Sequence, residues 1–113
     1  MPSTARRLIR DLAEAGRYAY VPAICLVEAA YLVEKARLAE SSLALLRTAL
    51  AEEWSNLRVA PLDLEVAEAL RSVSREEVPD LPDRVIAATA LSMGFPLVTR
   101  DRRIVASNVE TVW

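Results

Sequence analysis

The sequence contains no histidine and a single cysteine, Cys25. Without histidine the chain has no imidazole, so Ser-His-Asp catalysis, Cys-His catalysis and imidazole-ligated metal centres are excluded. One cysteine allows neither an internal disulfide nor a cysteine-based metal cluster. Cys25 lies in an apolar run, and we expect it to be a buried structural thiol. Carboxylates are the residues left for catalysis, and their natural metals are hard cations such as Mg²⁺ or Mn²⁺.

Glycine and aromatic residues are also scarce. Two glycines among 113 residues disfavour an all-β fold, which needs many tight turns. Hydrophobic residues make up 53% of the chain and aromatics only 5%, which suits helices packed on a small sheet. The length fits one domain, which we place at residues 1–113. The net charge is −2, so the molecule as a whole does not attract nucleic acid.

No long apolar run is present that could act as a signal peptide or a membrane span. The first residues, MPSTARRLIRDLAEAG, lack the apolar region that a secretory signal requires. We therefore predict a cytoplasmic location and no membrane partner.

Helical and strand patterns alternate along the chain. Strand patterns occupy residues 17–22, 57–62, 96–100 and 109–113. Helical patterns occupy residues 5–15, 23–38, a segment from Ser41 or Ser42 to Trp54, residues 64–73, and a segment from Asp83 to the turn at Gly94. The order helix, strand, helix, helix, strand, helix, helix, strand, strand is typical of an α/β domain with a mainly parallel sheet.

The stretch LPDRVIAATALSMGFPLVTRD, residues 81–101, combines a helix, a Gly-Phe-Pro turn and a strand. A helix running away and a strand running back bring Asp83 and Asp101 to the same end of the domain. Asp101 follows a strand, at the sheet edge where ligands bind in open α/β folds. The alternative for Asp83 is a helix-capping role, for which Asp80 competes. The alternative for Asp101 is a turn residue or an ion pair with a neighbouring arginine.

Glu28 is a third candidate. It falls between one and two turns into the helix after the first strand, in line with Ile24, Tyr31 and Leu32. A carboxylate in an apolar stripe must be paired, protonated or bound to a metal, because its burial is costly. The alternative is a glutamate at the helix edge that reaches solvent or an arginine.

Together these acids predict a metal site. Three carboxylates at one end of a sheet repel one another unless a cation lies between them. Mg²⁺ or Mn²⁺ held in this way can activate water at a phosphorus centre, as in nucleases and phosphatases. Four arginines beside the acids could receive a phosphate backbone: Arg84, Arg100, Arg102 and Arg103.

On these motifs the sequence resembles a PIN domain of the VapC type, the ribonuclease toxin of a VapBC toxin–antitoxin pair. The matching segments are VPAICLVEAAYLVEKARL, LPDRVIAATALSMG and FPLVTRDRRI. The resemblance implies a three-layer α/β/α fold with a small, mainly parallel sheet. It implies a Mg²⁺- or Mn²⁺-dependent endoribonuclease that forms a homodimer, cleaves RNA and is inhibited by a cognate antitoxin. Glu28, Asp83 and Asp101 match three of the family's metal-binding acids, and Thr99 matches a hydroxyl position near that site.

The sequence departs from the family at its beginning. Members normally start with an apolar strand that ends in an aspartate, followed by a short helix. This segment of roughly 20 residues, by typical element lengths, has no counterpart before the first helical pattern. We expect either a start codon further upstream or a truncated form with impaired metal binding.

Two other readings stay open. One is a non-enzymatic PIN-like module for binding or dimerisation. The other is an unrelated α/β or helical interaction protein in which the acids serve as helix caps.

Overall fold

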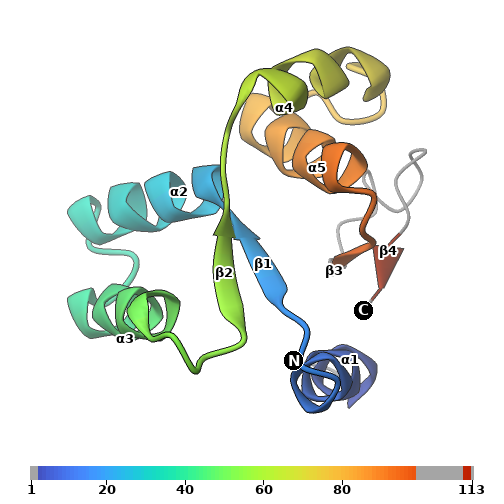
Figure 1. The fold of residues 1–113 in the computed structure, drawn as a ribbon. Helices are drawn as coiled ribbons and strands as arrows, with labels where there is room; N and C mark the ends of the chain where they lie inside the picture. Colours follow the sequence, from blue (N-terminus) through green and yellow to red (C-terminus); the bar gives the residue numbers. More distant parts are fainter. Residues whose placement is uncertain (1–2, 99–110, 113) are drawn as a thin grey trace. The chain divides into compact units, whose positions relative to one another are not determined.

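The computed structural model describes residues 3–98 and 111–112, with the side chains of residues 7–97 and 111. Along the chain the elements are α1 (Ser3–Glu14), β1 (Ala19–Pro22), α2 (Ala23–Glu34), α3 (Glu40–Ala51), β2 (Leu57–Ala60), α4 (Leu64–Ala69), the short 3₁₀ helix η1 (Leu70–Ser72), α5 (Leu81–Met93), β3 (Leu97–Val98) and β4 (Thr111–Val112) (Figure 1). This order confirms the predicted mixed α/β fold. None of the described helices has both the length and the apolar character that a membrane crossing needs.

The chain divides into two compact units. Residues 9–61 form the β1–β2 unit, and residues 1–8 with 62–113 form the α4–α5 unit. The division falls within α1. The prediction of one domain over residues 1–113 stays a prediction.

In the β1–β2 unit the two strands run parallel. Ala19 pairs with Leu57 and Pro22 with Ala60. Parallel neighbours need a crossover connection, which α2 and α3 supply. The first helix ends as predicted at Gly16, whose φ of 70° is in the left-handed region that glycine adopts without steric cost.

The turn before β2 corrects one expectation. The helix that was predicted to reach Trp54 ends at Ala51, and Glu52 is already extended. The chain must reverse here so that β2 can lie parallel to β1. Arg58 holds the turn: its Nη1 donates to the carbonyls of Ser55 and Leu57 at 2.6 and 2.7 Å. Trp54, where the helix was predicted to end, lies in this turn with 86% of its surface exposed.

The α4–α5 unit contains a tightly packed core of small side chains. It comprises Val66, Val73, Val78, Ala87, Ala88 and Ala90. The side chain of Asp63 caps α4 by accepting a hydrogen bond from the backbone N–H of Val66 at 3.0 Å. Thr89 is buried, and its hydroxyl donates to the carbonyl of Val85 at 2.7 Å.

The end of α5 is the predicted glycine turn. Gly94 has a φ of 70°, and the backbone N–H of Phe95 donates to the carbonyl of Ala90 at 3.2 Å. This six-to-one bond is typical of a Schellman motif. The chain then enters β3, which pairs in parallel with β4 through Leu97 and Thr111.

Candidate functional site

Asp83 lies in the first turn of α5 and is half-buried. The cap of this helix is Asp80, whose Oδ2 accepts a hydrogen bond from the backbone N–H of Asp83 at 3.0 Å. The structure thus decides between the two candidate caps in favour of Asp80. The carboxylate of Asp83 is not the cap. Its negative charge at the N-terminus of α5 is favoured by the helix dipole.

Arg84 has a different role from the predicted one. Its Nη2 donates to the carbonyl oxygens of Leu70 and Val73, at 3.0 Å each. Its Nε is buried and has no hydrogen-bond partner among the residues that the structure describes. The Nη2 of this guanidinium is therefore occupied by protein backbone, which favours a structural role for Arg84 over the predicted contact with a phosphate. Arg100, Arg102 and Arg103, named with it, lie outside the described residues.

Glu28 is half-buried on α2, between one and two turns from its start. The stripe in which the sequence placed it is not a buried face: α2 has no buried residue, and Tyr31 is 54% exposed. This expectation failed because α2 is apolar on most of its circumference. Helical spacing alone then singles out no inner face.

The predicted convergence of the acids stays a prediction. Asp101 and Thr99 lie outside the described residues. Glu28 belongs to the β1–β2 unit and Asp83 to the α4–α5 unit. Within the described part of the chain, no three Asp, Glu or Cys residues form a group that could hold a metal ion. Cys25, predicted to be buried, is half-buried on α2.

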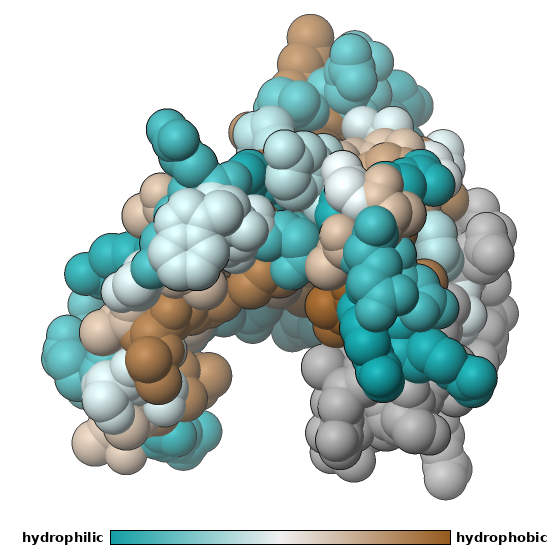
Figure 2. All heavy atoms as spheres, turned by 60° about the horizontal axis from the view of Figure 1, so that its bottom comes forward, coloured by the Kyte–Doolittle hydropathy of each residue, from teal (hydrophilic) through white to brown (hydrophobic). Residues whose placement is uncertain are grey.

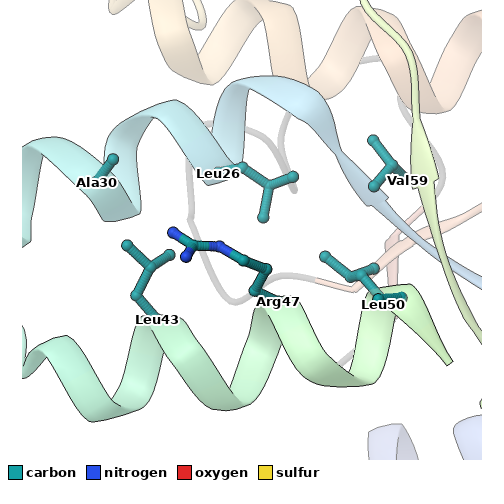
Figure 3. A pocket seen from close by; sticks show the side chains of 7 residues that line it. Leu26, Ala30, Leu43, Arg47, Leu50 and Val59 are labelled. Carbon is teal, nitrogen blue, oxygen red and sulfur yellow. The ribbon is translucent and has the colours of Figure 1, made fainter.

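The sequence reasoning missed a pocket in the β1–β2 unit. It has a volume of about 350 Å³ and lies between α2, α3 and β2. Figure 3 shows the side chain of Arg47 reaching from α3 into the space between the two helices, among otherwise apolar residues. The lining residues are Leu26, Ala30, Leu43, Arg47, Leu50, Ala51 and Val59.

Apolar side chains also reach the surface around this pocket. In Figure 2 they gather on the side that α2 and α3 occupy in Figure 1. Leu45 on α3 is 73% exposed, and Val27 on α2 is exposed as well. The sequence did contain a signal for this exposed apolar surface. The helix α2 is apolar on most of its circumference, and one neighbouring helix can cover only part of such a surface.

Comparison with known proteins identifies the family. The profile of the PIN domain family matches residues 2–109. The chain belongs to the PIN domain family. Its fold is similar to a chain in the crystal structure of VapBC2 from Rickettsia felis bound to a DNA fragment from their promoter. That match has a TM-score of 0.73 at 18% sequence identity, and covers 99% of this chain and 85% of the other. No curated protein matches the chain.

The donor chemistry of this PIN domain fits the metals that the family uses. PIN domains are generally nucleases that depend on divalent metal ions. Hard divalent cations prefer carboxylate oxygens, and the predicted ligands Glu28, Asp83 and Asp101 are all carboxylates. Because Asp80 supplies the cap of α5, the carboxylate of Asp83 is not committed to capping. The side chain of Arg84 donates to the backbone carbonyls of Leu70 and Val73.

Proposed function

We propose that this PIN domain is a metal-dependent endoribonuclease, the toxin of a toxin–antitoxin pair, which hydrolyses phosphodiester bonds in RNA. The observation that carries the proposal is the family match over residues 2–109. The similarity of its fold to a chain of the VapBC2 complex supports the toxin–antitoxin part.

The proposed site consists of Glu28, Asp83 and Asp101 as ligands of Mg²⁺ or Mn²⁺, with the hydroxyl of Thr99 beside them. The bound cation would activate water and stabilise charge at the phosphorus. The three carboxylates would hold it through charge and through the affinity of oxygen donors for hard cations. Asp80 supports this arrangement because it fixes the backbone N–H of Asp83 at the start of α5.

The proposed partners are RNA as substrate, a cognate antitoxin protein and a second copy of the chain in a homodimer. Arginines beside the acids remain the groups suited to bind the RNA backbone, apart from Arg84. The proposed location is the cytoplasm, where RNA and an antitoxin would meet the toxin.

The test is cleavage of single-stranded RNA in Mg²⁺ or Mn²⁺, with and without a chelator. We expect the substitutions Asp83→Asn and Glu28→Gln each to reduce cleavage by more than about 100-fold, since outer-shell residues already cost about 10–100-fold. Asp11→Asn and Glu76→Gln change exposed acids outside the site and serve as controls. Cleavage that survives both site substitutions or the chelator would refute the proposal.

A second candidate is a non-enzymatic PIN-like module for binding or dimerisation. The observation that favours it is the open apolar pocket between α2 and α3. A thermal unfolding experiment with and without divalent metal distinguishes the two proposed functions. A ribonuclease is stabilised by metal and loses that stabilisation in Asp83→Asn, because a ligand that binds only the native state stabilises it. A binding module shows no metal-dependent shift and cleaves no RNA.

A further inference from the structure

The side chain of Arg84 links the first turn of α5 to η1. Its Nη2 donates two hydrogen bonds of 3.0 Å, to the carbonyls of Leu70 and Val73. Leu70 is the first residue of η1, and Val73 is its C-cap. The carbonyl of Leu70 also accepts the backbone N–H of Val73, at 3.1 Å. A carbonyl at the C-terminal end of a helix, such as that of Val73, has no intrahelical donor and is well suited to a cationic side chain.

The surroundings of this contact make it rigid. Val73 is fully buried in the core of the α4–α5 unit, and the Nε of Arg84 is buried too. Hydrogen bonds from charged donors are stronger than neutral ones, so removing the guanidinium takes a strong hydrogen bond from each of these two carbonyls. Arg84 therefore connects the start of α5 to two residues that precede it in the sequence: Leu70, 14 residues earlier, and Val73, 11 residues earlier.

Asp83 lies between two anchors. On one side, its backbone N–H donates to the carboxylate of Asp80, and the N–H of Arg84 donates to the carbonyl of Asp80 at 3.0 Å. On the other side, the side chain of Arg84 is fixed to η1. The backbone of Asp83 cannot turn or shift without breaking one of these sets of hydrogen bonds.

We infer that Arg84 is a positioning residue for Asp83: it clamps the start of α5 onto η1 and so sets the direction in which the Asp83 carboxylate meets a divalent cation. This inference rests on the proposed function, which makes Asp83 a metal ligand. It assigns to Arg84 no contact with RNA. The cation affinity of the site then depends on a residue that does not touch the cation.

The test compares Arg84→Met, which removes the donors and keeps the aliphatic stem, with Arg84→Lys, whose ammonium can donate both bonds. Arg75→Met is the matched control, since Arg75 is exposed in the same unit. The readouts are the Mn²⁺ dissociation constant by calorimetry, the unfolding temperature, and kcat and KM for RNA. We expect Arg84→Met to weaken Mn²⁺ binding about 10-fold and to lower kcat with KM for RNA unchanged, as outer-shell changes do. Arg84→Lys restores most of the affinity, and Arg75→Met behaves as the unsubstituted protein.

Three outcomes overturn the inference. One is unchanged Mn²⁺ affinity in Arg84→Met at a temperature where both proteins are folded, even if its unfolding temperature falls. A second is a raised KM with weaker salt dependence and unchanged metal affinity, which would make Arg84 a phosphate contact. If Arg84→Met does not fold, Arg84→Leu, which also lacks donors, replaces it, and unchanged Mn²⁺ affinity in that variant is the third.

The failure of the proposed function looks different. In that case the unsubstituted protein binds no Mn²⁺ and Asp83→Asn changes nothing, and the role of Arg84 falls with it. If the unsubstituted protein binds Mn²⁺ and Asp83→Asn abolishes binding, only the Arg84 variants decide the inference.

Discussion

The two units bury their apolar residues very differently. In the α4–α5 unit, short side chains such as Ala87 and Ala88 are completely buried. In the β1–β2 unit, α2 and α3 carry larger apolar side chains, yet neither helix has a buried residue. The contrast teaches that burial follows from how closely a neighbouring element approaches, and hydrophobicity alone does not secure it.

The physical difference lies in side-chain size at the helix surface. Alanine on α5 allows close approach of the elements that pack on it, with few voids between them. Between α2 and α3, leucines from both helices and Arg47 line an open pocket. An open apolar pocket is suited to bind a partner, whereas a dense core is suited to fix the position of a residue such as Asp83.

The largest expected effect comes from overfilling the dense core. Ala88 is fully buried, so Ala88→Leu should destabilise the protein by about 3 kcal/mol, the upper end for overpacking. The same change at the exposed Ala44 on α3 should alter stability by less than about 0.5 kcal/mol. Urea unfolding of both variants measures the difference. An equal loss of stability in the two variants would contradict the conclusion that the α4–α5 unit is the more densely packed of the two.

The helix caps provide a second contrast. α4 has a side-chain cap, Asp63, whereas α3 begins after Ala39 without one. Asp63→Ala should cost about 1 kcal/mol, and Ala39→Asp should add up to about 1 kcal/mol, because Ala39 already has the extended backbone of a cap. Asp63→Asn keeps the acceptor and should be nearly neutral. Chemical denaturation checks all three, and a destabilised Ala39→Asp would contradict the argument.

The smallest expected effect is an increase in stability. Ala36, just after α2, has a φ of 57°, where an alanine is strained. Ala36→Gly should relieve the strain and stabilise the protein by about 0.5–1 kcal/mol. Ala44→Gly, within α3, should instead cost about 1 kcal/mol. Thermal unfolding shows directly whether each variant is more or less stable. A loss of stability in both variants would contradict the idea that Ala36 is strained.

Local signals in the sequence predicted the local structure well. Gly16 and Gly94 ended their helices because their left-handed conformations are cheap only for glycine. The order of helices and strands followed from periodicity. The acids of the candidate site came from position in these elements and from family resemblance, and their convergence remains a prediction.

Two of the failures share one cause: each depended on a contact with another segment of the chain. Trp54 continues the spacing of α3, but the helix ends at Ala51 because the chain must return to pair β2 with β1. Arg84 is adjacent to an acid in the sequence, yet its partners are the carbonyls of η1. A local sequence pattern does not indicate which residue of another segment a side chain or strand will contact.

By itself, the sequence limited the chemistry open to this protein: without histidine and with one cysteine, carboxylates are the side chains suited to a hard cation, and its PIN motifs agree with the family match. Only the tertiary structure decided that Asp80 caps α5, that Arg84 serves the backbone, and that α2 and α3 leave a pocket. The reason is physical. Residue types fix which atoms can donate, accept or bind metal, whereas distances between segments fix which of those atoms meet.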